Sequence, residues 1–395
     1  MFSKNVSIFY ALAIMCSNVA RYYLSFLSPT VSFEVGNISK VPFIYNSDRL
    51  KVIENFSKEC VKLAKKDWDS FETSWDFQRH PLLYKNSTIA EAFEQWQKKC
   101  TDRFNHIKVN EEELNRIFID IYGLQDELTP EVEDKDITVR KADLSRDIRS
   151  FISYAIGCMF GRYSLDEEGL IYAGGEWDSN KYKTFIPDED NCIPITDEEY
   201  FPDDIVGRFV EFVKTVYGAA TLEENLDFIA KALGNKGNTS REVIRNYFLK
   251  DFYADHLKVY QKKPIYWLFD SGRENGFKAL IYMHRYDVDT VGRVRMDYLH
   301  RAQKYVETAM QSAQYTIENT TSASEKSKAT KAVTKYMKQL AEMKIYDEAI
   351  AHIANKRIEI DLDDGVKVNY EKFQGVEVAQ EGKKALKVDL LAKIK

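Results

Sequence analysis

The sequence predicts a mainly helical protein with small β elements, an α+β chain. Apolar residues return every three or four positions over most of the 395 residues, which is the period of an α-helix. One segment, 264–284, carries alternating apolar runs on both sides of a turn sequence, as a β-hairpin does. Two long helical stripes over 288–357 predict an antiparallel helical hairpin.

The first predicted element is an amphipathic helix near the N-terminus. Lys4 and the apolar run after it imitate a signal peptide, but the run is too short to span a membrane before Ser17 and Arg21. At helical period, six residues form one core-facing stripe: Ile8, Leu12, Met15, Val19, Tyr22 and Tyr23. We therefore expect a cytoplasmic protein without a membrane segment.

Residues 27–43 predict a strand-and-turn connection after this helix. Pro29, Gly36 and Pro42 separate short runs of β-type residues. Proline and glycine at such spacing are typical of turns between short strands.

The next predicted elements are helices. Apolar spacing over 50–108 predicts two of them, broken near Pro81. A third is predicted over 110–123, with Asn110 as its N-cap and Gly123 at its C-terminal end.

The middle of the chain alternates a helix, an acidic loop and more helices. Ser145 to Tyr163 predicts a helix. The section 166–204 has 13 acidic residues against two lysines and reads as a loop. Helical spacing then returns in three segments, at about 198–217, 221–233 and 239–257.

The last predicted elements are the two hairpins and a tail. The strands of 264–284 are separated by the turn sequence DSGREN. In 288–357 the first stripe comprises Tyr298, Ala302, Tyr305, Ala309 and Ala313, and the second Val333, Met337, Leu340, Tyr346, Ile350 and Ile353. The polar run NTTSASE between them predicts the turn and a cap for the second helix. The tail 358–395 predicts a tight turn at Asp364-Gly365 and a lysine-rich end.

Composition gives no global sign of a nucleic-acid binder. The formal net charge is -6, whereas such proteins are usually basic, so any DNA contact must come from local patches. Five scattered cysteines without a CxxC pair fit neither a zinc site nor a disulfide framework. They are typical of buried thiols in a reducing cytoplasm.

Motifs for catalysis are missing. The glycine runs GCMFG (157–161) and AGGEW (173–177) lack the strand–glycine loop–helix context of a phosphate-binding site. The sequence contains no GxSxG, no HExxH and no Asn/Asp-Pro-Pro-aromatic motif of an adenine methyltransferase. Asp188, Glu189 and Asp190 lack the regular oxygen-ligand spacing of a metal site, so a solvated acidic loop is the better interpretation. The sequence therefore predicts no catalytic residue, no metal site and no cofactor site.

One basic segment is a candidate for binding. Between His256 and Lys304 there are ten Lys and Arg against five Asp and Glu. Such a surplus can neutralise phosphates, and arginines can read guanine edges; ordinary solvated charges on a hairpin and helix are the alternative. The candidate DNA-binding residues are Lys262, Lys263, Arg273, Lys278, Arg285, Arg293, Arg295, Arg301 and Lys304.

Four long phrases occur in an order that resembles a known family. They are ELNRIFIDIYGLQDELTPEV (113–132), RDIRSFISYAIGCMFGRYSLDEEGLIYAGG (146–175), KKPIYWLFDSGRENGFKALIYMHRYD (262–287) and DDGVKVNYEKFQG (363–375). The chain resembles the C-terminal portion of the PglX family, the adenine-specific DNA methyltransferases of BREX phage-defence systems. Fused type IIG restriction-modification enzymes show a related arrangement.

The resemblance implies a parent enzyme that transfers a methyl group from S-adenosylmethionine to adenine N6 in a short DNA sequence. The catalytic domain of that parent is not in this sequence, so we expect a truncated or split gene product or one fragment of the enzyme, and carry over no catalytic residue. The implied domains are the end of a target-recognition-like region (1–48), a mostly helical domain (49–287), the helical hairpin (288–357) and a tail (358–395). The implied partners are double-stranded DNA, the missing methyltransferase domain or chain and other BREX proteins.

Three functions stay open at this point. The first is a non-catalytic DNA-docking and scaffold part of the methyltransferase. The second is a protein-interaction module in which the hairpin 288–357 docks a separate methyltransferase chain or another defence component. The third and weakest is a nuclease, since Asp361 and Asp363 lie in a segment that superficially resembles nuclease strands.

Overall fold

The computed structural model describes residues 6–28, 33–83, 87–380 and 382–394. The chain forms two compact units, one comprising residues 1–77 and 92–143 and the other residues 78–91 and 144–395. Helices predominate and the sheets are small and antiparallel, so the predicted fold class is confirmed.

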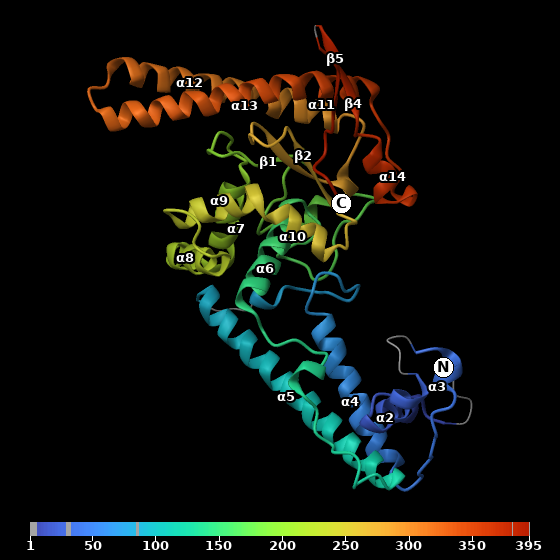
Figure 1. Cartoon of the computed structure of the whole chain (residues 1–395). Helices are drawn as coiled ribbons and strands as arrows, with labels where there is room; N and C mark the ends of the chain where they lie inside the picture. Colours follow the sequence, from blue (N-terminus) through green and yellow to red (C-terminus); the bar gives the residue numbers. More distant parts are fainter. Residues whose placement is uncertain (1–5, 29–32, 84–86, 381, 395) are drawn as a thin grey trace. The chain divides into compact units, whose positions relative to one another are not determined.

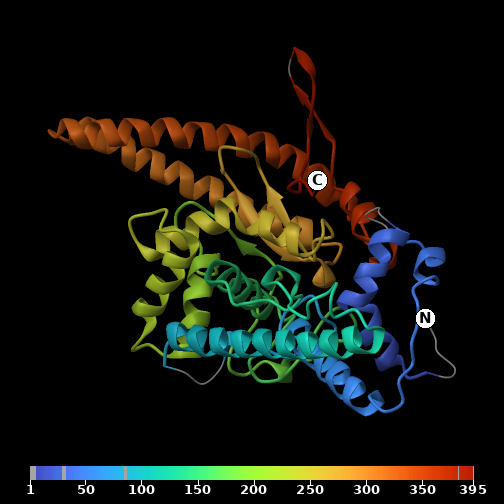
Figure 2. The same cartoon turned by 60° about the horizontal axis from the view of Figure 1, so that its bottom comes forward.

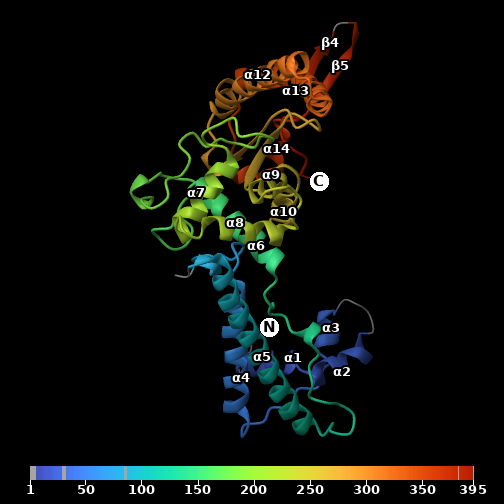
Figure 3. The same cartoon turned by 90° about the vertical axis from the view of Figure 1, so that its left-hand side faces the viewer.

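The first unit is helical. Its helices are α1 (Ile8–Met15), α2 (Asn18–Leu27), α3 (Val35–Ile38), α4 (Leu50–Trp68) and most of α5 (Ile89–Tyr122). Tyr10 of α1 packs edge-on against Phe118 of α5, with ring centroids 5.7 Å apart. Figure 3 shows α4 beside α5, where Arg103 donates to Asp67 at 2.8 Å in a nearly buried ion pair.

The N-terminal stripe was predicted on the wrong face of α1. Ile8 and Leu12 are 56% and 41% exposed, whereas Tyr10 and Ile14 are buried. The helix also breaks at Ser17, whose hydroxyl caps α2 by accepting a hydrogen bond from the amide of Ala20. Small residues such as alanine share the buried face of α1, so large apolar side chains alone did not mark it.

Two further predictions for the first unit were wrong. The described part of the expected strand-and-turn connection, residues 33–43, holds the short helix α3 and no strand, while residues 29–32 lie outside the described residues. Asn110 does not start a helix, because α5 runs continuously through it. Its side chain is buried and donates instead to Glu59 of α4 at 3.2 Å. Gly123 ends α5 with a positive φ of 65°, as predicted.

The second unit begins with a group of helices. They are α6 (Leu144–Met159), α7 (Ile205–Tyr217), α8 (Leu222–Leu233), α9 (Ser240–Lys250) and α10 (Phe252–Val259). α7 starts later than predicted because Asp204 caps it, accepting from the amides of Val206 and Gly207. Arg245 of α9 donates twice to the same carboxylate at 2.8 Å, which joins α9 to the start of α7.

A three-stranded antiparallel sheet forms the centre of this unit. β2 (Tyr266–Asp270) and β3 (Lys278–Tyr282) are the predicted hairpin, which is confirmed. β1 (Ile193–Pro194), from the acidic loop section, pairs with the other side of β3. All five residues of β3 are buried, since it is the central strand. β1 was not predicted, because a strand of two residues has no period.

The long helical hairpin is also confirmed. α11 (Thr290–Arg293), a π-helical turn over Val294–Leu299 and α12 (His300–Asn319) run on into one another, and α13 (Ala323–Lys356) returns beside α12. Ser322 caps α13 by accepting from the amide of Glu325 at 3.3 Å. Both views of the pair show its far end reaching past the β2–β3 hairpin (Figures 1 and 2, orange).

The tail turns at Asp364-Gly365 as predicted, with Gly365 at a positive φ of 80°. The turn does not close a hairpin but leads into the short helix α14 (Val366–Glu371). A second hairpin follows, β4 (Val376–Gln380) with β5 (Lys383–Val388), and its buried Val376 and Val378 join the core under α13.

α13 grips the turn between β2 and β3. The Glu342 carboxylate accepts three hydrogen bonds, from the Ser271 hydroxyl at 2.8 Å and from the amides of Glu274 at 2.9 Å and Gly276 at 3.1 Å. A Cβ on Gly276 would lie 2.9 Å from the Gln339 carbonyl oxygen, so the turn approaches the helix as closely as glycine allows. The sheet and the helical hairpin are therefore locked together at this point.

Removing the three hydrogen bonds that Glu342 accepts should destabilise the second unit. We expect Glu342→Ala to lower the free energy of unfolding by about 2–3 kcal/mol, because three donors lose a charged acceptor. Urea denaturation measures the loss. Glu348→Ala, an exposed position on the same helix, is the matched control and should change stability by less than about 0.5 kcal/mol. Equal stabilities of the two variants would contradict the role given to Glu342.

Candidate nucleic-acid interface

The nine basic residues predicted as DNA contacts divide into two groups in the structure. The exposed group comprises Lys262, Lys263, Arg273, Arg301 and Lys304. The other group is held by internal bonds and comprises Lys278, Arg285, Arg293 and Arg295. A cation that already has fixed partners must give them up to bind phosphate, so the second group is less suited to that role.

Lys278 is the most buried of the nine. It lies on the central strand β3 and is only 9% exposed. Its ammonium donates to the carbonyl of Leu249 at 3.1 Å and lies 3.5 Å from Asp270. Both faces of β3 are covered, as its five buried residues show, so this side chain lies inside although it points to the face opposite its neighbours.

Arg285 organises the acidic loop. Its guanidinium donates to the carbonyl oxygens of Asp188 at 2.7 Å and Glu189 at 2.9 Å. The guanidinium also lies over the ring of Trp177, 4.4 Å from its centroid. These contacts fix a loop that contains many acidic side chains, and they occupy the donors that a phosphate would need.

The two remaining arginines brace the start of the helical hairpin. Arg293 donates to Asp287 at 2.7 Å. Arg295 donates twice to Asp347 of α13, at 2.8 and 3.2 Å, and His300 lies 2.9 Å from the same carboxylate. Burial alone would raise the pKa of Asp347, but the hydrogen bonds from Arg295 and His300 outweigh it and lower that pKa. The π-helical turn thus presents Arg295 to the partner helix.

The five exposed cations do not share one surface. Lys262 and Lys263 precede β2, and Arg273 lies in the turn at its other end, so the strand's five residues alone separate them by about 16 Å. Arg301 and Lys304 lie in the first turns of α12. A run of charges in the sequence therefore spreads over three places in the fold.

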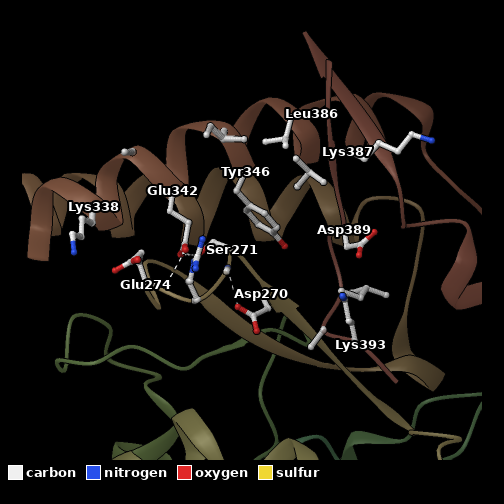
Figure 4. Close-up of a pocket in the computed structure, with 17 residues that line it drawn as sticks. Asp270, Ser271, Glu274, Lys338, Glu342, Tyr346, Leu386, Lys387, Asp389 and Lys393 are labelled. Atoms are coloured by element: carbon white, nitrogen blue, oxygen red, sulfur yellow. Dashed lines mark hydrogen bonds between the residues drawn. The ribbon is translucent and has the colours of Figure 1, made fainter. Parts of the chain in front are cut away.

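Arg273 lines a cavity of about 680 Å³ between the β2–β3 turn, α13 and residues 386–393 (Figure 4). Lys338, Lys387 and Lys393 line it as well. The carboxylate of Glu342, which also faces it, is occupied by the three hydrogen bonds of the turn. Asp270, Glu274 and Asp389 line it too, so four carboxylates balance the four cations and the cavity has no surplus of positive charge.

The sequence reasoning missed a set of exposed lysines on α13. They recur at spacings of three and four residues and are Lys328, Lys331, Lys335 and Lys338. That spacing places them on one face of the helix, and it could have been found by testing charged residues for helical period as apolar residues were tested.

The sequence predicted that the acidic residues at 188–190 form a solvated loop. In the structure this loop is not fully solvated. The amide of Cys192 donates to the carboxylates of both Asp188 and Asp190 at 3.0 Å. The Tyr298 hydroxyl lies 2.9 Å from Asp190 and 2.7 Å from the carboxylate of Asp203. Burial, reinforced by the charge of Asp190, raises the pKa of Asp188 to about 7. The cluster packs the loop onto the helical hairpin.

Two of the histidines are structural. His256, inside the basic segment, is buried, and its Nε2 accepts from the amides of Ile265 and Tyr266 at 3.2 Å. Burial lowers the pKa of His256, and also that of His80, to about 3. Both rings are therefore neutral at physiological pH and add nothing to a basic surface.

A metal site and a membrane-spanning helix are both absent from the described ranges. No cluster of His, Cys, Asp and Glu there could hold a metal ion. Within the same ranges, none of the helices combines the length and apolar character that crossing a bilayer requires. Asp361 and Asp363, the candidate nuclease residues, form a local turn in which Asp361 accepts from the amide of Asp363 at 2.9 Å.

Comparison with known proteins gives two extensive matches. The chain is 49% identical, over an alignment of 381 positions that covers 94% of it, to the adenine-specific methyltransferase PglX of Lacticaseibacillus casei (strain Zhang), of which it covers 32%. It is 36% identical, over an alignment of 409 positions that includes gaps and again covers 94% of the chain, to the adenine-specific methyltransferase BrxX of Escherichia coli O9:H4 (strain HS), of which it covers 33%. No protein-family model matches. The chain thus spans about a third of the length of these relatives, and the predicted resemblance to PglX is confirmed.

The Asp188 cluster makes a prediction about pH. Because the folded-state pKa of about 7 lies above the ordinary value of 3.8, folding is favoured at low pH and this contribution is lost as pH rises through 7. Asp188→Asn keeps the acceptor for Cys192 without the charge. We expect its Tm to rise relative to the unmodified chain by on the order of a few degrees between pH 4 and pH 8.

Glu189→Gln is the control for that experiment, since it removes one charge from an exposed neighbour. Thermal unfolding of the three proteins across the pH range should show the divergence for Asp188→Asn alone. Parallel Tm curves for all three would contradict a buried Asp188 carboxyl.

Proposed function

We propose that this chain is a non-catalytic DNA-docking and scaffold portion of a site-specific adenine-N6 DNA methyltransferase of a BREX phage-defence system. The observation that carries the proposal is the match to PglX and BrxX, both named adenine-specific methyltransferases, over 94% of the chain. In such an enzyme, separate elements hold the duplex and choose the site while a catalytic domain handles the flipped adenine.

The assignment of a supporting role follows from the motifs. Methyl transfer to adenine needs a glycine loop for S-adenosylmethionine and an Asn/Asp-Pro-Pro-aromatic motif that faces the base, and the sequence has neither. The chain also spans only about a third of its relatives' length. We therefore assign cofactor binding and catalysis to a part of the enzyme other than these 395 residues.

The exposed cations support DNA as the partner. Arg301 and Lys304 lie on the outer surface of α12, and among the described residues neither forms an ion pair. Exposed Lys and Arg side chains bind phosphates by releasing condensed counterions, which makes the affinity depend on salt. The acidic loop section repels phosphate and favours an orientation that turns it away from DNA.

A second candidate is a protein-docking role for the helical hairpin. Tyr315 of α12 and Met337 of α13 are 68% and 59% exposed. Aromatic and methionine side chains are enriched in protein interfaces. Such a surface could hold a separately encoded methyltransferase chain or another defence component, and co-purification with that chain in the absence of DNA affinity would favour this role.

The DNA-docking role predicts salt-sensitive duplex binding. In fluorescence anisotropy with a labelled duplex, log affinity should fall linearly as log salt concentration rises. Arg301→Gln with Lys304→Gln should reduce that slope by roughly 2, because each phosphate contact contributes about 0.9. Lys62→Gln with Lys66→Gln, an exposed pair on α4, serves as the control and should leave the slope unchanged.

Absence of binding by the unmodified chain at 50 mM salt would refute the DNA-docking role. If the two variant pairs lower the salt slope equally, the attraction to DNA is non-specific. This result would also count against a docking surface on α12.

The supporting role also predicts that the chain alone is inactive. Purified chain incubated with labelled S-adenosylmethionine and duplex DNA should transfer no label to adenine, because its sequence lacks both motifs of the reaction. Isothermal titration with S-adenosylmethionine should likewise give no binding heat. Label recovered as N6-methyladenine would overturn the assignment.

A further inference from the structure

One face of α13 changes character along the helix. In the C-terminal half, Tyr346, Ala349 and Ile353 are buried against the core of the second unit. At spacings of three and four residues toward the N-terminus, the same face passes through Glu342, which binds the β2–β3 turn, and then carries four lysines before Glu325 in the first turn of the helix. The four lysines are Lys338, Lys335, Lys331 and Lys328, called the lysine ridge below.

The change of character coincides with a change of surroundings. α13 covers the sheet and its turn up to Gln339, whose amide donates to the carbonyl oxygens of Glu274 and Asn275. Beyond that point the α12–α13 pair reaches past the sheet (Figures 1 and 2), and all four lysines of the ridge are exposed. Where this face of α13 covers no core, its side chains are lysines with exposed ammonium groups.

The projecting part of the hairpin, residues 308–338, has five lysines against Glu318 and Glu325, a net charge of +3. Residues 326–338 contain five lysines and no acidic residue. The facing segment of α12, residues 308–317, contains no charged residue at all. A chain of net charge -6 therefore concentrates positive charge at one projecting end.

Fixed acidic partners are few along the ridge. Asp197, from the loop after β1, forms an ion pair with Lys335 and also accepts from the Gln339 amide at 3.0 Å. Within the described part of the chain, Lys328, Lys331 and Lys338 form no ion pair. The pairing at Lys335 fixes the base of the ridge and leaves three ammonium groups available.

We propose that the lysine ridge binds the sugar-phosphate backbone of duplex DNA, an inference that rests on the DNA-docking function. From Lys328 to Lys338 the helix rises about 15 Å. Phosphates on one strand follow each other every 3.4 Å along the duplex axis, so the ridge spans about four of them. Arg273 lines the same cavity as Lys338, but acidic side chains there equal the basic ones in number, so the proposed contact is confined to the ridge.

The composition of the ridge favours a nucleic acid over a protein partner. Lysine is depleted in protein–protein interfaces, whereas phosphate contacts regularly use it. The contacts carry no base information, since lysines aligned along a backbone neutralise charge without reading base edges. The ridge would therefore hold and orient the duplex, and other elements of the enzyme would select the sequence.

The test replaces the three unpaired lysines in the full chain. Lys328→Gln with Lys331→Gln and Lys338→Gln should weaken duplex binding at least ~10-fold at low salt and reduce the salt slope by roughly 3. Arginine at the same three positions keeps the charge and should retain binding. Thermal unfolding should be unchanged for both variants, because these side chains are exposed.

A matched control is available in the same unit. Lys214, Lys231 and Lys236, on and after α7 and α8, are equally exposed, and their triple glutamine variant should bind DNA as the unmodified chain does. If the unmodified chain binds but the ridge variant keeps its affinity and slope, the ridge proposal is wrong and the docking function stands. If the unmodified chain does not bind at 50 mM salt, the docking function itself fails.

Discussion

The arrangement of the second unit depends on the grip of α13 on the turn between β2 and β3. Glu342 satisfies three donors of that turn, and Gln339 satisfies two of its carbonyl oxygens. Because Gly276 lets the turn approach the helix backbone, this contact fixes how far α13 lies from the sheet and where along the sheet it lies. A helix of 34 residues can then project past its core without losing its position, since one end is packed and the middle is clamped.

Charge in this chain serves two separate purposes. Arg285 and Arg295 stabilise the fold. Arg285 holds the acidic loop in place, and Arg295 joins the start of the helical hairpin to Asp347. Lys328 and Lys331 make no such bond among the described residues and lie at the projecting end. A surplus of basic residues in a stretch of sequence therefore overstates the surface available to DNA, because arginine is well suited to internal bidentate pairing while unpaired lysine remains in solvent.

Strong periodic patterns were predictable from the sequence and local exceptions were not. The β2–β3 hairpin and the α12–α13 pair follow from alternation and helical spacing, and both are confirmed. The buried face of α1 was missed because the alanines among its core residues do not stand out in a pattern of large side chains. Asn110 carries the features of a cap, but its packing against Glu59 within a continuous helix overrides them. For the candidate interface, the residue types were predictable, whereas the burial of Lys278 required the strand order that places β3 at the centre.

Under the proposed DNA-docking role, the distribution of charge, rather than its total, would orient a duplex on this chain. A net charge of -6 opposes DNA binding overall, and the acidic section 166–204 concentrates that repulsion in one segment. The basic end of the α12–α13 pair provides the opposing attraction. Screening limits both to about 8–10 Å at physiological salt, so they act only when the duplex is already near the surface. Together they would favour one orientation of a bound duplex over its reverse, and the proposal leaves the reading of bases and the transfer of the methyl group to other parts of the enzyme.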